Sequence, residues 1–278
     1  MKCNYHTHTH FCDGKENMRF FVEKALDLKF DHLGFSSHAP ISEQYDFTLI
    51  EEDIPVYLNE IEHYQKKYPQ IKIFKGLECD YIPGITKDFS YYKKNFNLDY
   101  IIGGVHLVKV PNSEEVWFID GPKKETYDAG IAQFFNHNIK KAVTCFWEQT
   151  FEMIETQKFD IIAHLDKIKM HNQERFFKED EDWYLKLVDY AIDLIVKKQI
   201  IVEINSRGIY RLRCKDFYPS DYILQKLAKA KAAIVISSDA HKAEELALYY
   251  EEAQNKLKSF GVDTLAVLEN GTWNSLKF

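Results

Sequence analysis

Short apolar runs and longer amphipathic stretches alternate along the chain, and most of the apolar runs end in a polar residue. The runs are NYHTH, LGFSSH, IKIFKGLE, YIIGGVH, IIAH and AIVISSDAH. Runs of this length and composition are typical of strands. We therefore expect a strand within NYHTH and further strands at 32–36, 71–77, 100–105, 159–163, 200–204, 233–237 and, briefly, 264–267.

The stretches between these runs carry apolar residues at helical spacing, as Met18, Phe21, Val22 and Ala25 do in the first of them. This spacing predicts amphipathic helices. The expected helices lie at 17–29, 51–68, 86–95, 124–138, 140–157, 182–198, 219–231 and 244–260. Alternation of strand and helix at intervals of about 25–40 residues predicts a parallel sheet.

A single α/β barrel accounts for this alternation. The chain has 278 residues, of which 45% are hydrophobic, and this is enough for one such barrel. We predict one domain over 1–278, because no linker rich in Pro, Gly or Ser, no repeat and no low-complexity tract divides the sequence. The segment between His106 and His164, which contains VPNSEEVWFIDG, is interpreted as a long barrel loop near the site.

Charge and cysteine content narrow the class of protein. The net charge of −7 and the pI near 5.9 disfavour nucleic acid as a partner, since its binders usually present a basic face. Five scattered cysteines without a C-x-x-C pair indicate reduced thiols. Met1 leads directly into a strand, and no apolar stretch approaches ~18 residues. We expect a cytoplasmic protein without membrane contact.

Nine residues with metal-binding side chains lie where apolar runs end or just beyond. Imidazole and carboxylate together suit zinc, iron or manganese. Because about four ligands serve one tetrahedral zinc, nine predict a multinuclear centre of roughly two to three divalent ions. The candidate ligands are His6, His8, Asp13, His38, Glu78, His106, His164, Asp239 and His241.

Each candidate also has an ordinary explanation when it is taken alone. An H-x-H pair is unremarkable in a chain with eleven histidines, and Ser and Asp commonly cap helices. Six of the eleven histidines nevertheless fall at or just past apolar strands, where a titratable group is unfavourable. This coincidence favours a metal centre. We interpret His32, His63, His137 and His171 as surface or capping residues.

Barrel geometry explains how ligands far apart in sequence can meet, because functional groups lie at the C-terminal ends of barrel strands. His6 and His8 alternate on one strand, so both side chains point to the same face and can hold one ion. Asp239 and His241 have the same spacing but follow a strand, where a turn can direct them to different ions. Glu78 can bridge two ions through its two oxygens.

Seven motifs carry a family resemblance that spans almost the whole chain. They are HTHTHFCDG (6–14), SSHAP (36–40), GLECD (76–80), GGVH (103–106), AHLD (163–166), EIN (203–205) and SSDAH (237–241). In this order they resemble the motifs of the polymerase and histidinol phosphatase (PHP) family. The resemblance implies a distorted (β/α)7 barrel with a metal centre of three ions at the C-terminal ends of the strands.

The same resemblance implies how the ligands divide among the ions. The first ion would be held by His6, His8, Glu78 and Asp239. Glu78 would bridge to a second ion on His106 and His164, and the third would be held by Asp13, His38 and His241. Ser37 departs from the acidic residue that many members carry at this position, but that residue is not a family ligand.

Within the family, the chain most resembles histidinol-phosphate phosphatases, on the stretches SSHAP, EINSRGIYR and FIDG. The resemblance implies hydrolysis of a small phosphate monoester, L-histidinol phosphate, in histidine biosynthesis. Two ions that share a hydroxide and clamp the phosphoryl oxygens suit this reaction. We place the catalytic role on Glu78, Asp239 and His241.

Cationic and aromatic side chains near the strand ends are candidates for substrate binding. Guanidinium matches phosphate bidentately. The candidates for phosphate, in order of preference, are Arg207, Arg211 and Lys169. Asp120 is expected to bind the substrate ammonium, and Trp117 and Phe118 to form apolar walls beside the imidazole.

Three alternatives remain open at this point. One is a PHP phosphoesterase acting on nucleotides or nucleic acid ends. Another is an amidohydrolase barrel, which also begins with H-x-H but typically bridges its ions with a carboxylated lysine instead of a glutamate. The third is a non-catalytic PHP module, against which the intact ligand set argues. Oligomeric state and the choice among zinc, iron and manganese also stay open.

Overall fold

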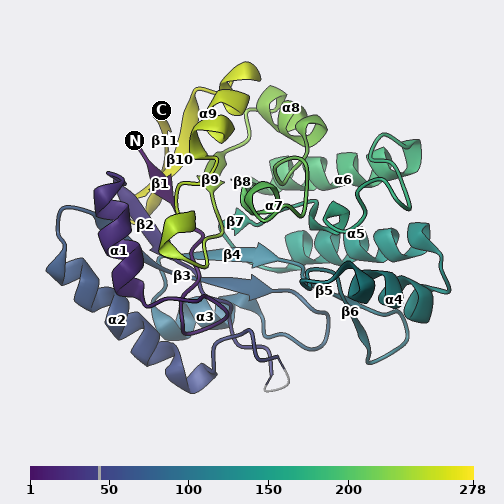
Figure 1. The fold of residues 1–278 in the computed structure, drawn as a ribbon, viewed down its shortest axis with the longest axis horizontal. Coiled ribbons are helices and arrows are strands. Elements are labelled where there is room, and N and C mark those ends of the chain that lie inside the picture. The colour runs from purple at the N-terminus through teal and green to yellow at the C-terminus, as the bar shows by residue number, and fades with distance from the viewer. Residues whose placement is uncertain (43–44) are drawn as a thin grey trace.

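Seven parallel strands form the central sheet of the computed structural model, which describes residues 1–42 and 45–278 (Figure 1). Their order in the sheet, β1-β2-β3-β4-β7-β8-β9, follows the chain order. The strands are β1 (Cys3–Asn4), β2 (His32–Phe35), β3 (Lys72–Asp80), β4 (Tyr100–Gly104), β7 (Ile161–Ile162), β8 (Ile201–Asn205) and β9 (Ile234–Ser237). The predicted α/β barrel is confirmed.

The two edge strands of the sheet approach each other just beyond their last paired residues. Thr7 and Ala240 form an isolated parallel bridge, in which the His8 amide donates to the Ala240 carbonyl at 2.8 Å. The Ala240 amide donates in turn to the carbonyl of His6 at 3.2 Å. The barrel is therefore closed by a narrow contact at its C-terminal end, next to the candidate ligands.

Helices surround the strands, as Figure 1 shows. Amphipathic patterning is the reason, since each helix buries one face. The helices are α1 (Met18–Asp27), α2 (Ile54–Lys67), α3 (Phe89–Phe96), α4 (Lys124–Phe135), α5 (Ile139–Thr156), α6 (Asp182–Lys198), α7 (Arg207–Tyr210), α8 (Asp221–Lys229) and α9 (Tyr250–Ser259), with 3-10 turns η1 (Glu51–Asp53), η2 (Lys167–Lys169) and η3 (Ala243–Glu245). In the described chain no helix combines the length and the apolar character that crossing a bilayer requires.

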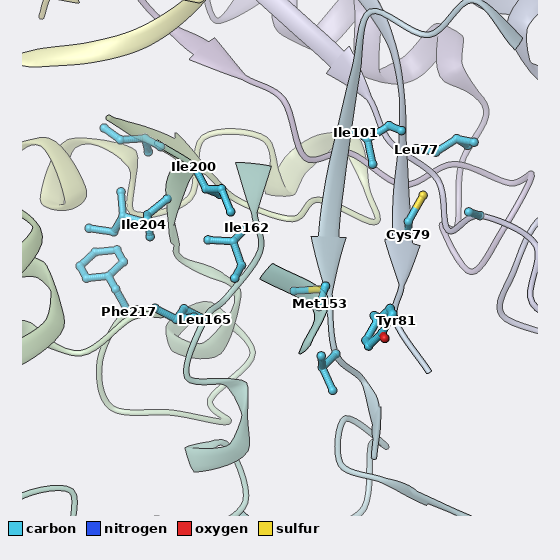
Figure 2. Packing of buried hydrophobic residues seen from close by; sticks show 14 of the residues in the cluster. Leu77, Cys79, Tyr81, Ile101, Met153, Ile162, Leu165, Ile200, Ile204 and Phe217 are labelled. Carbon is cyan, nitrogen blue, oxygen red and sulfur yellow. The ribbon is translucent and has the colours of Figure 1, made fainter. Parts of the chain in front are cut away.

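Alternate strand residues face two different cores, because successive side chains of a strand point to opposite sides. Ile101 and Ile162 face outward and join the large core beneath the helices. Figure 2 shows part of this layer, with Met153 of α5 beside the strand residues. Ile102 and Ile161 face inward and fill the barrel interior.

A separate hairpin contributes to the interior core. The predicted strand at 264–267 pairs antiparallel in β10 (Thr264–Glu269) with β11 (Thr272–Lys277), outside the seven-stranded sheet. Trp273 of this hairpin packs edge-on against Tyr5 and Tyr100, with ring centroids 5.0 and 6.3 Å apart. The hairpin thus completes the interior core next to these two tyrosines.

Two local expectations, both about histidines, need correction. His32 is buried, with its Nδ1 2.8 Å from the Tyr5 hydroxyl, and His171 is buried with Nε2 2.7 Å from the Gly121 carbonyl. Neither is a surface residue, because each ring fills space between elements far apart in sequence. The long segment after His106 contains α4 and α5, as predicted, and also a hairpin of β5 (Leu107–Lys109) and β6 (Val116–Phe118), which was not predicted.

Replacement of Gly76 by alanine is expected to lower the free energy of unfolding by about 1–3 kcal/mol, the usual cost of overpacking a core. An added Cβ would lie 2.4 Å from Cζ of the buried Tyr100. Urea unfolding monitored by circular dichroism measures the effect. Gly121→Ala is the control, because its Cβ would meet Phe118 at an ordinary 3.5 Å. Equal stability of the two variants would contradict the packing described here.

Candidate metal centre

The carboxylate of Glu78 lies at the centre of the predicted ligands. Glu78 is 1% exposed, near the end of β3. Its Oε2 is 3.1 Å from Nε2 of His6 and 3.3 Å from Nε2 of His8. Its Oε1 is 3.1 Å from Nε2 of His164 and 3.6 Å from Nε2 of His106. The two oxygens therefore face two different pairs of histidines.

Asp239 joins the first pair, His6 and His8, to form a group of three candidate ligands. The Nε2 atoms of His6 and His8 are 3.1 Å apart, and Asp239 Oδ1 is 3.3 Å from that of His8. Ligand atoms of these three residues all lie within 4.8 Å of one another. Ring nitrogens and carboxylate oxygens that converge on one point fit a transition-metal ion.

The second pair consists of His106 and His164, whose Nε2 atoms are 3.0 Å apart. Together with Glu78 they form another group of converging ligand atoms. Gly104 leaves room for this group, because a Cβ there would lie 3.2 Å from Cε1 of His164. The chemistry of this donor set also fits a metal ion.

The remaining predicted ligands lie nearer the solvent. Asp13 Oδ2 is 2.9 Å from Nε2 of His241, and Asp13 also forms a group of converging ligand atoms with His8 and His38. The Asp13 side chain is 31% exposed. Nδ1 of His38 is 3.4 Å from Glu78 Oε2, so this outer group is continuous with the inner two. All nine predicted ligands are thus brought together.

Acidic side chains dominate the electrostatics of the centre. Burial disfavours a charged His6, but Glu203, Glu78 and Asp239 outweigh burial and raise the pKa of His6 to about 10. Burial alone would raise the pKa of Glu78, yet the neighbouring histidines hold it well below its usual range. Burial and His8 lower the pKa of His241 to about 4, which leaves the neutral imidazole that binds metals. Divalent cations would neutralise the ionised carboxylates.

Two candidate ligands have an unusual backbone conformation. His164 and Asp239 have φ angles of 27° and 51°, in the left-handed region. Such conformations cost a non-glycine residue on the order of 1–3 kcal/mol and cluster at functional sites. The surrounding hydrogen bonds therefore hold both side chains in place against a local preference for another conformation.

Two buried acids beside the ligands were not predicted. Asp80 contacts Nδ1 of His106 and of His38 at 2.5 and 3.1 Å, and Glu203 contacts Nδ1 of His6 at 2.5 Å. Both lie within motifs quoted above, GLECD and EIN. The signal that could have identified Asp80 is its spacing of two from Glu78, which places both side chains on one face of β3.

A cavity of about 600 Å³ opens above the centre and is lined by Glu78, His106, Asp239 and His241 among others. Arg207, Arg211 and Arg213 also line it. Arg213 was not predicted, although it belongs to the same segment. Phe47 and Phe118 line the cavity with nearly parallel rings whose centroids are 5.9 Å apart.

The arginines differ in how firmly they are held. Arg207 donates from Nη1 to the Asp239 carbonyl at 2.8 Å and to the Tyr210 hydroxyl at 3.1 Å. Its side chain is 13% exposed, whereas that of Arg211 is 43% exposed and lies 3.8 Å from Glu245. Arg207 is therefore the more rigid of the two. It lies in the short helix α7, just past the end of β8.

Lys169 and Trp117 are corrections to the predicted substrate site. The ammonium group of Lys169 is buried, 2.9 Å from Asp166 and 3.1 Å from the Phe217 carbonyl. Asp166 neutralises its charge there. Among the residues that the structure describes, 1–42 and 45–278, Lys169 is not one that lines the cavity. Trp117 packs on Tyr127 in the core, since it alternates with Phe118 along β6.

Asp120 lies in the cavity wall near the second histidine pair. Its Oδ2 is 3.0 Å from Nζ of Lys167 and 3.8 Å from Nε2 of His106. Its Oδ1 is 3.8 Å from Nη1 of Arg213. Burial alone would raise the pKa of Asp120, but Lys167 and His106 lower it. The carboxylate is therefore ionised, and two cations of the protein compete for it with any bound ligand.

Known proteins with the same fold support these observations. A relative from Deinococcus radiodurans, described as "probable histidinol-phosphatase", is 25% identical over 267 residues, which is 95% of either chain. A candidate histidinol phosphatase of Listeria monocytogenes matches with a TM-score of 0.79 at 22% identity, covering 90% of this chain and 99% of its own. Histidinol phosphate phosphatase of Lactococcus lactis, solved with zinc, L-histidinol and phosphate, has a TM-score of 0.68 at 20% identity over 98% of both chains.

The fold of these two structures is that of the present chain, a distorted (β/α)7 barrel. The family model described as "PHP domain" matches residues 4–207. This range is most of the sequence and includes seven of the nine predicted ligands, all but Asp239 and His241. The chain therefore belongs to the PHP domain family.

Proposed function

We propose that this protein is a metal-dependent phosphomonoesterase that hydrolyses L-histidinol phosphate to L-histidinol and phosphate. The observation that carries the proposal is the convergence of nine ligands around Glu78, below a cavity that also contains arginine and phenylalanine side chains. The description of the Deinococcus radiodurans relative supports the substrate. So do the zinc, L-histidinol and phosphate bound by the Lactococcus lactis enzyme.

The proposed cofactors are roughly two to three divalent ions of zinc, iron or manganese. His6, His8, Glu78 and Asp239 would hold the first ion. Glu78, His106 and His164 would hold the second, and Asp13, His38 and His241 the third. When bound, such ions neutralise phosphoryl charge and lower the pKa of water. Glu78, Asp239 and His241 would be catalytic because they are proposed ligands that also line the cavity.

The residues of the cavity wall would orient the substrate. Arg207 is proposed to bind the phosphoryl group, because its guanidinium has five donors and its contacts to Asp239 and Tyr210 fix its plane. Arg211 would supply a second, more mobile positive charge. At the other wall, Phe118 offers a face for the imidazole ring, and the ionised Asp120 offers an anion for the ammonium group.

We further propose that residues 1–278 act as one unit in the cytoplasm. All five cysteines are free in the structure, in agreement with a reducing compartment. The net charge of −7 disfavours a long polyanion, so a small monoester is the preferred partner over nucleic acid.

A phosphate-release panel tests the proposed substrate. The metal-loaded protein is expected to have a kcat/KM for histidinol phosphate at least ten-fold above that for AMP or a dinucleotide, since the cavity offers separate groups for phosphate, ammonium and ring. Release of an amide product would instead indicate an amidohydrolase. Preference for AMP would refute the proposed substrate and retain a PHP phosphoesterase.

Glu78→Gln is expected to lower both metal content and activity. Removal of a residue that hydrogen-bonds to a metal ligand typically lowers metal affinity or activity by about 10–100-fold. Removal of a bridging ligand should therefore lower activity by more than roughly 100-fold. Elemental analysis after purification without chelators should find about two to three ions in the parent protein and fewer in the variant. His63→Ala and Glu155→Gln, both on exposed helix faces, are the controls. A parent protein with one ion or none would refute the multinuclear centre.

Arg207→Ala is expected to lower kcat/KM for histidinol phosphate by about ten- to a hundred-fold, because a charge-assisted contact contributes about 1.5–3 kcal/mol. The metal content should not change. Arg19→Ala, at an exposed position of α1, is the matched control. Loss of metal in the Arg207 variant would mean that its contact with the Asp239 carbonyl holds a ligand in place. Full activity with full metal would remove Arg207 from the substrate site.

A further inference from the structure

Asp80 and Glu203 are two buried acids beside the centre that belong to no proposed ligand group, although Asp80 converges with His38 and His106. The two acids are 2% and 0% exposed. Isolated buried carboxylates are unfavourable unless they are paired or hydrogen-bonded. Their contacts are therefore informative about what these two acids do.

Asp80 uses one oxygen for each of two histidines. Oδ1 contacts Nδ1 of His106 at 2.5 Å, and Oδ2 contacts Nδ1 of His38 at 3.1 Å. Nε2 of His106 faces His164 at 3.0 Å, so its Nδ1–H is the group that donates to Asp80. These two histidines follow β4 and β2 and belong to the second and third proposed ion groups.

Glu203 connects a different pair of groups, through one histidine ring and one backbone amide. Oε2 contacts Nδ1 of His6 at 2.5 Å. Oε1 accepts from the backbone amide of His164 at 3.1 Å and from Nδ2 of Asn205 at 2.6 Å. The amide contact explains how the left-handed backbone of His164 is held. Asn205 Nδ2 also lies 3.3 Å from Asp239 Oδ2, so the network reaches a third ligand.

We propose that Asp80 and Glu203 are positioning residues, each of which couples the binding of two different ions. Asp80 joins the second and third ions through His106 and His38. Glu203 joins the first and second through His6 and His164. This proposal rests on the proposed metal centre and adds the residues that position its ligands.

The physical basis is the choice of histidine tautomer. A carboxylate at Nδ1 keeps the proton there, so the Nε2 lone pair faces the ion and the ring cannot rotate. Removal of such a partner typically weakens metal binding by about 10–100-fold. Because each acid contacts residues of two ligand groups, one substitution should weaken the binding of two ions and leave the binding of the third unchanged.

Asp80→Asn and Glu203→Gln test this with little change in volume. An amide has one acceptor oxygen and no negative charge, so each variant loses at least one of its parent's contacts and weakens the others. Zinc-loaded proteins are titrated with a chelator, and released zinc is counted. Each variant is expected to release part of its zinc at about 10–100-fold lower chelator concentration than the parent. The remainder should be released as in the parent.

Asp99→Asn is the matched control. Asp99 accepts a hydrogen bond from the backbone amide of Lys75 at 2.7 Å, at the opposite end of β4 from the centre. Its substitution should lower stability without changing zinc release. Thermal unfolding of the metal-free proteins separates the two effects, because a purely structural role would lower that stability and leave zinc affinity unchanged.

Nitrogen-15 NMR of the histidine rings identifies which ligands are released. In the zinc-loaded parent, the Nδ1–H protons of His6, His38 and His106 should be protected from exchange. Asp80→Asn should lose the protection of His38 or His106 and keep that of His6, and Glu203→Gln should do the reverse. Zinc release unchanged in both variants, or identical in both and spread over all ions, overturns the inference. A parent protein that binds fewer than two zinc ions refutes the metal centre instead.

Discussion

The burial of Glu78 is the constraint on which the upper half of the barrel depends. A carboxylate that is 1% exposed has to be neutralised by groups within the protein or by bound cations. Its contacts are with five histidines that follow four other strands of the sheet, namely His6, His8, His38, His106 and His164. Only a barrel that brings the strand ends around one axis can deliver them, so closure of the sheet and assembly of the centre are one event.

The two ends of the barrel interior meet opposite requirements. At the N-terminal end, Tyr5, Tyr100 and the hairpin residue Trp273 fill the space with rings. There Tyr5 contacts His32, and burial lowers the pKa of that histidine to about 4, so it stays neutral. At the C-terminal end, the residues at and just beyond the strand ends are acids and histidines. Packing of rings stabilises the N-terminal end of the interior, whereas the C-terminal end requires neutralisation of its charges.

The residues of the cavity wall come from segments that follow the barrel strands. Arg207 is held by the carbonyl of Asp239, so the proposed phosphate contact is coupled to a proposed ligand. Phe118 and Asp120 come from the hairpin segment after His106, which a minimal barrel does not need. The metal centre is thus made by strand ends, and the proposed choice of substrate is made by the loops that follow them.

The sequence by itself determined the strands, the helices and the residue types of the centre, because these depend on local alternation and helical spacing. The bounds predicted for α6, 182–198, agree with the structure for this reason. The nine ligands could be named because imidazole and carboxylate groups stand out after apolar runs.

Contacts between distant segments were decided only by the tertiary structure. His6 meets Glu203 across 197 residues, and no local pattern predicts that Glu203 supports a ligand or that Asp80 serves two. Lys169 was a candidate for the substrate site because it is a cation near a strand end, but its ammonium group is neutralised by Asp166. A charged side chain pairs with whichever opposite charge the fold brings nearest, and that choice is made in three dimensions.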